Sequence, residues 1–450
     1  MNKPLKTTIY KLAPAVLISL IATSLGLLSL FKSKVPMIQD FGLMLTIGIV
    51  IAFLLALFVL LPILTIRTKL SVNSEKKVKE KKSSKYFQVM KKFTKGVLKV
   101  KYIILVVAVI LAGVGFFFDQ KVGVETDMET FMPQDSEALS DIHELRELVG
   151  STDSIVLMYQ SESIDSYDIV LEVKTISDML QTEYSDSIVR LGSVSTMLDM
   201  VSNSSWNEAN FETFYNQLPS DQLSLVQSSE ENIGIINVSL ANMDDTEFVE
   251  FLGDLSNSLN DLDSSIEITI TGQSIVEQEM LVAMTSDRLI ISLISIALVF
   301  VALLIIYRNL FKALVAILPI VFIIGWSGGV MYLLGFDYTP LTSTIGALII
   351  GIGTEFTILI LMRYYDLKKE TGNHVESISD AIGYMSKPII VSGITTIGGF
   401  SALVFSDFQI LSNFGIMTLI NISLALISSI VVLPALLGVI GKQAKAVASS

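Results

Sequence analysis

The chain has 450 residues, of which 51% are apolar and only 17% charged, and its formal net charge is −13. Soluble domains contain about a quarter charged residues, so this composition argues against a soluble protein, and the apolar fraction excludes intrinsic disorder. The absence of cysteine excludes disulfides, thiolate metal sites and thiol catalysis, and a chain with two histidines is unsuited to a histidine-based metal cluster.

Eight apolar stretches are long enough to cross a membrane. A helix that spans about 30 Å of hydrocarbon needs about 20 apolar residues. Stretches that meet this requirement lie at residues 12–31, 42–66, 102–118, 289–306, 313–334, 341–362, 388–405 and 414–441. The first stretch is too long for the apolar part of a cleaved signal peptide, so we predict that it is retained.

The charges are distributed unevenly between the segments that join these stretches. Residues 119–288 hold 34 acids and 5 bases, a net charge of −29, whereas residues 67–101 hold 13 bases and 2 acids, a net charge of +11. The overall net charge of −13 argues against nucleic acid as a partner. Because lysine and arginine favour the cytoplasmic side, an N-terminus in the cytoplasm agrees best with the sequence, since it leaves 24 of the 31 bases inside.

We therefore expect a multi-pass protein of the plasma or inner membrane with both termini in the cytoplasm. Residues 119–288 would form an extracytoplasmic domain, and residues 442–450 a cytoplasmic tail. Residues 67–101 would form a basic cytoplasmic segment, of which residues 67–85 are solvated and flexible. After it, Tyr86, Met90, Phe93 and Val97 recur at helical spacing among lysines. They predict a basic amphipathic helix on the anionic inner leaflet.

The acidic domain is predicted to contain both strands and helices. Strands are expected at 154–160, 187–192, 233–240 and 266–271, helices at 166–183 and 244–260, and shorter helices between 195 and 228. This order predicts an α+β domain of the split-βαβ, ferredoxin-like kind. His143 is its only histidine, and no glycine-flanked serine accompanies it. We therefore expect no enzymatic activity, and we predict no cofactor.

An internal repeat relates the first two membrane stretches to the last two. Thr23 and Gly26 correspond to Thr396 and Gly399 at an offset of 373 residues. Similar offsets relate further pairs, namely Tyr10 and Tyr384, Pro14 and Pro388, Phe41-Gly42 and Phe414-Gly415, and Leu61-Pro62 and Leu433-Pro434. Residues 1–66 are thus interpreted as the end of a preceding repeat unit, and residues 102–441, with five helices at 289–441, as a complete one. The missing half, or a second subunit, is an expected partner.

A family resemblance rests on several short motifs. They are Tyr307-Arg308-Asn309-Leu310, Pro319, Trp326, Gly351-Ile352-Gly353-Thr354-Glu355-Phe356, Arg363-Tyr364-Tyr365, Thr395-Thr396-Ile397-Gly398-Gly399-Phe400, Phe414-Gly415, Leu433-Pro434 and Phe131-Met132-Pro133. With them the chain resembles the resistance-nodulation-division (RND) superfamily, specifically its MMPL-type branch, which is related to sterol-sensing-domain proteins. The resemblance implies a proton-motive-force-driven exporter of hydrophobic or amphiphilic, lipid-like molecules, with the extracytoplasmic domain as porter. Membrane lipids, such a substrate and protons would be its partners.

Glu355 is the one ionisable residue well inside the eight stretches. Arg363 marks the inner edge of its helix, eight residues and hence about 12 Å away. A charge near the bilayer centre costs a few kcal/mol, so such residues seldom face lipid. Burial favours the neutral carboxyl, which can ionise when water or a cation approaches. We therefore predict a proton carrier. The alternative interpretation is a permanently protonated acid that is hydrogen-bonded to a neighbouring helix.

Small and hydroxyl-bearing residues accompany this acid. Candidate members of the proton relay, besides Glu355, are Thr354, Thr357, Thr395 and Thr396. Candidates for close helix packing are Gly351, Gly353, Gly398 and Gly399. The family pattern is aspartate followed by tyrosine, whereas this chain has Glu355 and Phe356, so water or a threonine would replace the phenol hydroxyl. The partner acid would belong to a helix that this chain lacks.

Three other functions stay open at the level of sequence. The bundle could bind a sterol-like lipid as a membrane sensor without transporting it. It could assist protein translocation, with the outer domain touching emerging polypeptides. The chain could also be an incomplete, non-functional fragment.

Overall fold

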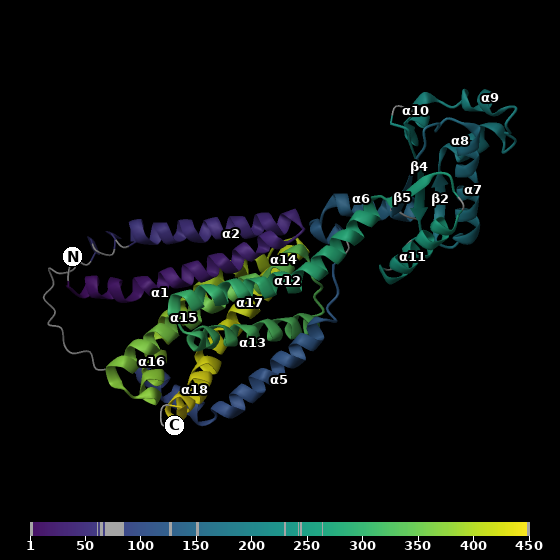
Figure 1. Cartoon of the computed structure of the whole chain (residues 1–450). Coiled ribbons are helices and arrows are strands. Elements are labelled where there is room, and N and C mark those ends of the chain that lie inside the picture. The colour runs from purple at the N-terminus through teal and green to yellow at the C-terminus, as the bar shows by residue number, and fades with distance from the viewer. Residues whose placement is uncertain are drawn as a thin grey trace. The chain divides into compact units, whose positions relative to one another are not determined.

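The computed structural model describes residues 3–60, 62, 63, 66, 67, 85–125, 128–149, 153–228, 231–241, 243, 245–262 and 264–447. The chain forms two compact units (Figure 1), a helical unit of Met1–Phe131 and Ala283–Ser450 and a sheet unit of Met132–Val282. The sheet unit is thus shorter than the acidic segment 119–288, because both ends of that segment belong to the helical unit. The linker at 68–84 and the last tail residues, 448–450, lie outside the described residues.

The prediction of eight apolar membrane stretches is confirmed by the helical unit. Among the described residues, eight helices are long and apolar enough to span a membrane. They are built from α1 (Lys3–Leu28), α2 (Pro36–Leu55), α5 (Lys101–Asp119), α12 (Gln273–Tyr307), α13 (Leu310–Leu334), α15 (Ile345–Thr371), α16 (His374–Val404) and α17 (Gln409–Ile427). The shorter elements are η1 (Ser29–Lys32), η2 (Ala56–Leu60), α4 (Lys85–Lys99), η3 (Met128–Phe131), α14 (Pro340–Ser343), η4 (Ser428–Val432) and α18 (Leu433–Val447).

Polar residues and glycines set the turns between these helices. Arg308 has a positive φ of 49°, and the side chain of Asn309 accepts a hydrogen bond of 3.1 Å from the amide of Lys312 at the start of α13. The Tyr-Arg-Asn-Leu motif is therefore a tight turn with a helix cap. Helices α13 and α15 are capped at their C-terminal ends by Gly335 and Gly372, whose φ values of 67° and 66° favour glycine.

Helix α15 is the centre of the bundle, where it packs against α1, α13, α16 and α17 (Figure 1). A second close contact joins α5 to α13. A Cβ atom on Gly115 would lie 1.9 Å from the carbonyl oxygen of Gly325, and the indole of Trp326 donates to the carbonyl of Ala108 at 3.1 Å. Small residues let the two backbones touch, as is usual for helices in membranes.

The hairpins α1–α2 and α16–α17 share local structure at matching positions of the repeat. A Cβ atom on Gly42 would lie 2.7 Å from Cβ of Leu30, and one on Gly415 would lie 2.9 Å from Cβ of Leu403. The π-helices Ala56–Leu60 and Ser428–Val432 each stand directly before a Leu-Pro pair. Because proline clashes with the carbonyl four residues earlier, the wider π turn accommodates it in both hairpins.

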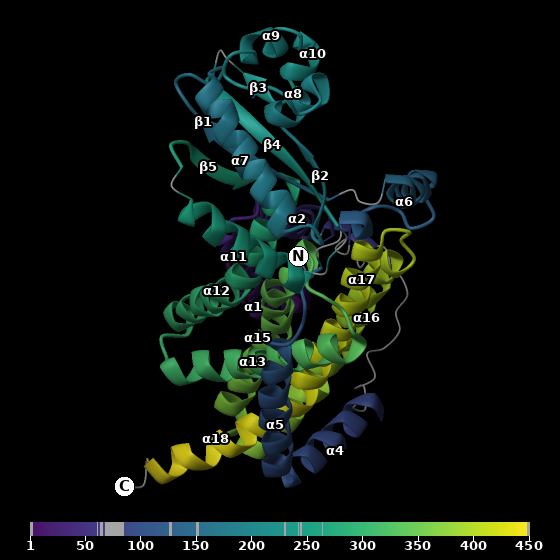
Figure 2. The same cartoon turned by 90° about the vertical axis from the view of Figure 1, so that its right-hand side faces the viewer.

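A helix, α4 (Figure 2), lies where the amphipathic helix was predicted. It packs against α16. The Phe87 ring lies 4.7 Å from that of Tyr384, and the ammonium of Lys91 lies 2.6 Å from a carboxylate oxygen of Asp380. Phe93, by contrast, is 43% exposed. Part of the apolar face is therefore covered by the protein, and a position on the inner leaflet stays a prediction for the rest.

The sheet unit follows the predicted order of strands and helices. After α6 (Glu137–Val149) come β1 (Ser154–Gln160), α7 (Tyr167–Glu183), β2 (Ile188–Gly192), α8 (Val194–Ser202), α9 (Phe211–Tyr215), α10 (Ser220–Leu223), β3 (Gln227–Ser228), β4 (Ile233–Leu240), α11 (Asp245–Asp261) and β5 (Glu267–Thr271). The four predicted strands and two long helices are confirmed to within a residue, whereas the short β3 was not predicted.

The sheet has the order β2-β4-β1-β5, with β3 pairing β4, and all its pairs are antiparallel. Each β-α-β pair encloses one strand of the other pair, which defines two interlocked split units. Alternate residues of β1 and β4 are buried, and Leu157 lies opposite Ile236 and Ile270. Buried side chains of α7 and α11 complete this core, among them Val173 and Leu255.

Candidate functional site

Glu355 lies on α15 at the border of two helix faces. Residues three and four positions apart are neighbours on a helix surface, so Glu355 adjoins Ile352 and Gly351. The Gly351 side faces α1, because the hydroxyl of Thr23 donates to the carbonyl of Gly351 at 3.0 Å. The Ile352 side lines a pocket between α15 and α17. A change in the charge of Glu355 can therefore affect both the contact of α15 with α1 and the pocket between α15 and α17.

The carboxyl group of Glu355 is partly buried, and in the described part of the chain it receives no hydrogen bond. This matters for the alternative interpretation of a permanently protonated acid held by a neighbouring helix. Such an acid would donate its proton to a fixed acceptor. No described residue supplies that acceptor, so the described contacts of Glu355 give the alternative interpretation no support.

The four predicted threonines use their hydroxyls within their own helices. Thr354 donates to the carbonyl of Ile350, and Thr357 to that of Gly353 at 2.9 Å. On α16, Thr395 donates to Val391 at 2.8 Å and Thr396 to Ser392 at 3.0 Å. Ordinary backbone bonding thus occupies all four hydroxyl protons, and the structure does not bring Thr395 or Thr396 into hydrogen-bond contact with Glu355.

The four predicted packing glycines fall into two groups. On α15, a Cβ atom at Gly351 would lie 2.8 Å from Cγ2 of Thr23, and one at Gly353 would lie 3.4 Å from Ile320 on α13. On α16, a Cβ atom placed on Gly398 or Gly399 would have no described atom within 4 Å apart from the adjoining backbone of its own helix. Gly351 and Gly353 therefore pack against neighbouring helices, whereas Gly398 and Gly399 make no helix contact in the described chain.

The face of α16 that carries Thr396 and Gly399, here called the open face, can be compared with the equivalent face of α1. Gly26, the counterpart of Gly399, faces α12 and α15, and its carbonyl accepts a hydrogen bond of 3.0 Å from Ser295. Thr23, the counterpart of Thr396, binds α15 through Gly351. Equivalent residues are thus covered in one hairpin and uncovered in the other. The open face of α16 has the composition of a helix contact, but the described residues supply no helix to fill it.

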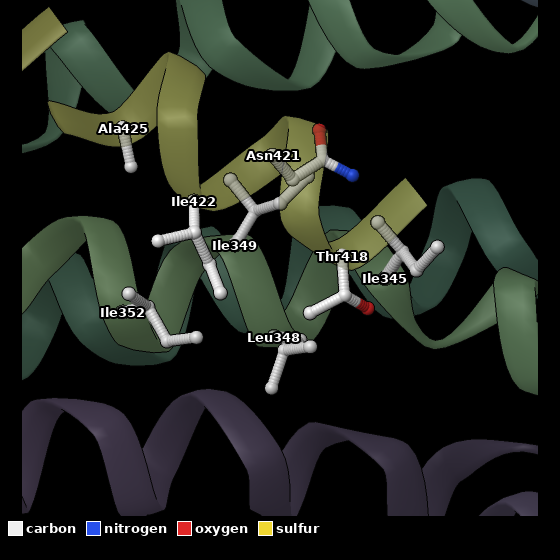
Figure 3. A pocket seen from close by; sticks show the side chains of 8 residues that line it. All are labelled: Ile345, Leu348, Ile349, Ile352, Thr418, Asn421, Ile422 and Ala425. Carbon is white, nitrogen blue, oxygen red and sulfur yellow. The ribbon is translucent and has the colours of Figure 1, made fainter. Parts of the chain in front are cut away.

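The pocket beside Glu355 is mostly apolar. Its lining comes from two helices, with Ile345, Leu348, Ile349 and Ile352 on α15 and Thr418, Asn421, Ile422 and Ala425 on α17 (Figure 3). Thr418 is 1% exposed and Asn421 is 4% exposed. Sequence reasoning missed both residues, since a single asparagine or threonine in an apolar helix is an ordinary observation.

Comparison with known proteins decides the family. Residues 135–449, more than half of the chain, match the MMPL family. The chain belongs to the MMPL family. The resemblance to the MMPL family is thereby confirmed, and the match extends from the sheet unit to the last helix.

Individual relatives of this MMPL protein differ in how much of their length they share with it. A membrane protein of Methanocaldococcus jannaschii is 24% identical, over 74% of this chain and 89% of its own. The hopanoid transporter HpnN of Rhodopseudomonas palustris is 28% identical, over 22% of this chain and 11% of its own. The hedgehog release protein Disp of the water bear Hypsibius dujardini has a similar fold, with a TM-score of 0.69 at 14% identity, over 96% of this chain and 59% of its own.

The MMPL chain also carries a buried ion pair that sequence reasoning missed. The guanidinium of Arg288 on α12 lies 2.7 and 2.8 Å from the two carboxylate oxygens of Asp119 at the end of α5. The hydroxyl of Tyr338 donates to Asp119 at 2.5 Å. Burial raises the pKa of Tyr338, and the Arg288 charge opposes that shift only in part. The signal in the sequence was a pair of opposite charges at the ends of two membrane stretches.

Proposed function

We propose that this MMPL protein takes part in proton-coupled export of hydrophobic or amphiphilic, lipid-like molecules, with Glu355 as the proton carrier. The observation that carries the proposal is a lone carboxyl group on the central helix, between α1 and the pocket, with no hydrogen-bond partner in the described chain. The family and the name of the hopanoid-transporting relative support the class of substrate.

In this proposal the helical unit lies in the cell membrane, with both termini in the cytoplasm and the sheet unit outside as porter. A proton that crosses the membrane through Glu355 contributes about 2.3 kcal/mol per 100 mV of membrane potential. The two charge states of Glu355 would pack differently against α1 and α17, because a charged carboxylate binds water much more strongly than a neutral carboxyl group does. That difference is the step that would couple the proton to substrate movement.

We further propose that the open face of α16 receives a helix of the same type as α15 from another polypeptide segment. The counterpart face on α1 packs against α15 in that way. A second copy of α15 is unsuitable as the occupant, since its matching face is already covered by α1, and Ile350 on that face is 1% exposed. The incoming helix would carry the partner acid of Glu355.

The proposed function is tested in vesicles that contain the whole chain and an internal pH dye. A pH gradient is imposed, and a fluorescent phospholipid serves as the hydrophobic probe. We expect probe-dependent proton uptake by the unaltered chain and none by Glu355→Gln, because an amide cannot exchange a proton with water in this way. Glu370→Gln, which removes an exposed carboxylate from the same helix, is the matched control. Undiminished uptake by Glu355→Gln would reject the proposal.

A further inference from the structure

We infer that Thr418 and Asn421 hold a water molecule that passes protons between the Asp119 end of the helical unit and Glu355. The inference rests on the proposed function of Glu355. It adds a second site, formed by Thr418 and Asn421, whose ligand is water. The Asp119 end is the end of the bundle at which Asp119 and Arg288 form their ion pair.

Polar atoms without partners mark this site. In the described part of the chain, the hydroxyl oxygen of Thr418 and both amide atoms of Asn421 are buried and form no hydrogen bond. An amide has two donor protons and an acceptor oxygen, and burying such a group without partners is costly. Lipid supplies no hydrogen bonds. A polar molecule inside the pocket is therefore the partner that we assign to these atoms.

The surroundings of the pair restrict this partner to something small. The side chains of α15 that line the pocket are isoleucine and leucine, so the neighbouring helix provides no acceptor or donor. The pocket has a volume of about 10 Å³ for the centre of a water molecule, which is room for about one water. Figure 3 shows the Asn421 amide and the Thr418 hydroxyl at the same end of the pocket, the end formed by Ile345. Buried water makes two to four hydrogen bonds, and these two side chains supply them.

The Thr418–Asn421 site lies along α15 between the Asp119 end of the bundle and Glu355. Toward the Asp119 end, Ile345 and Ile349 also line a second pocket, which contains Asp119, Arg288, Ser292, Ser327, Tyr338 and Thr342. In the other direction, Ile352 is the last α15 residue of the first pocket and lies next to Glu355 on the helix. Polar groups thus stand before the Thr418–Asn421 site, and the proton carrier stands after it.

The first test asks whether the site holds water. The whole chain, in nanodiscs of neutral phospholipid, is exposed to a brief pulse of radiolysis, which oxidises side chains next to bound water. We expect oxidation of Ile349 and Ile422, and a decrease of about tenfold in Asn421→Leu and in Thr418→Val. Both substitutions keep the size of the side chain and remove a polar group that no described residue binds, so folding should be preserved. Absence of oxidation in the unaltered chain would overturn the inference.

The second test asks whether this water reaches Glu355. Transfer into D₂O shifts the infrared band of a protonated carboxyl, and Glu355→Gln identifies the band that belongs to Glu355. We expect exchange at Glu355 to slow by about tenfold in Asn421→Leu. Ser428→Ala is the control, because it removes a buried hydroxyl that already donates to the carbonyl of Pro319 and lies outside the pocket.

The outcomes separate the two proposals. Equal exchange rates in Asn421→Leu and the unaltered chain would overturn the water site and leave the role of Glu355 intact. A Glu355 band that never exchanges in the unaltered chain would overturn the role of Glu355 and the inference that depends on it. Slow exchange in Asn421→Leu together with normal exchange in Ser428→Ala supports both.

Discussion

The rings of Phe41 and Phe414, which occupy equivalent positions in the two hairpins, meet edge to face with centroids 5.8 Å apart and an angle of 87° between the rings. Phe41 lies on α2 and Phe414 on α17. Two residues that are counterparts in the repeat therefore touch each other, and hairpin α1–α2 contacts hairpin α16–α17 at this point. Phe414 is 3% exposed and also contacts Phe400 at 6.3 Å. The repeat thus has a direct consequence in packing.

We expect Phe414→Ala to destabilise the helical unit more than Phe41→Ala, because Phe414 is buried and contacts two rings. Edge-to-face pairs contribute about 0.5–1.5 kcal/mol beyond their burial. A double-mutant cycle on thermal unfolding in detergent should therefore give a coupling energy in that range. Strictly additive effects of the two substitutions would show that the contact between the rings carries no stability of its own.

The ion pair between Asp119 and Arg288 predicts an asymmetric response to mutation. Asp119→Asn should cost about 3–5 kcal/mol of unfolding free energy, because it leaves a buried guanidinium without its counter-charge. The double variant Asp119→Leu with Arg288→Leu removes both charges and should cost less than either single change. Thermal unfolding of Asp119→Asn, of Asp119→Leu and Arg288→Leu singly, and of the double variant provides the measurement. A double variant at least as unstable as the sum of the single ones would contradict this account.

Tyr338 adds a pH dependence to the same cluster. Burial holds the pKa of its phenol above the ordinary value of about 10. Because the pKa of Tyr338 is higher in the folded than in the unfolded state, the protonated phenol stabilises the folded state. This contribution to the free energy of unfolding is fully present below about pH 10 and is lost as the pH rises further. We expect the melting temperature to fall at alkaline pH, and to fall less steeply in Tyr338→Phe. Parallel curves for the two proteins would rule out Tyr338 as the titrating group.

The sequence predicted most of the fold because the relevant signals are averages over many residues. The eight apolar stretches are set by mean hydropathy over about 20 positions, and the strands of the sheet unit by alternation along five to eight residues. The apolar stretch predicted at 388–405 covers only the later part of α16, which begins at His374 and continues through Pro388. Its first turns are polar because they pack on α4, which apolarity alone cannot reveal.

The candidate site was predicted less completely, because it depends on pairs of residues from different helices. Glu355 stood out alone, as the one acid inside an apolar stretch. Its surroundings did not, since the hydroxyls of Thr395 and Thr396 bond their own helix. Thr418 and Asn421 could be recognised as candidates only from the structure, in which their buried polar atoms have no described hydrogen-bond partner. Neutral polar residues carry little signal in a sequence until their neighbours are known.

The contact between α4 and α16 depends on Lys91. Its ammonium lies 2.6 Å from Asp380 and 3.2 Å from Glu376, and the hydrogen bond to Asp380 raises the pKa of Lys91. The pairing therefore persists at neutral pH and weakens as the pH rises through that raised pKa. Partly exposed pairs contribute about 1 kcal/mol or less, so amide hydrogen exchange in α4 should quicken by about fivefold at most in Lys91→Gln. Lys92→Gln, at an exposed position, should leave exchange unchanged, and equal effects would contradict the role of the ion pairs.

The open face of α16 can be probed directly, because the sequence has no cysteine. Gly399→Cys and Gly113→Cys each place a thiol where no described atom lies within 4 Å. If a helix covers α16 in its native membrane, Gly399→Cys should react about tenfold more slowly there with a lipid-soluble maleimide than in the purified chain, since thiol reactivity follows exposure. Gly113→Cys, on α5, should react equally in both. Because Gly26, the counterpart of Gly399, is covered by α12 and α15, unprotected labelling of Gly399→Cys in the native membrane would mean that the two hairpins use their equivalent faces differently.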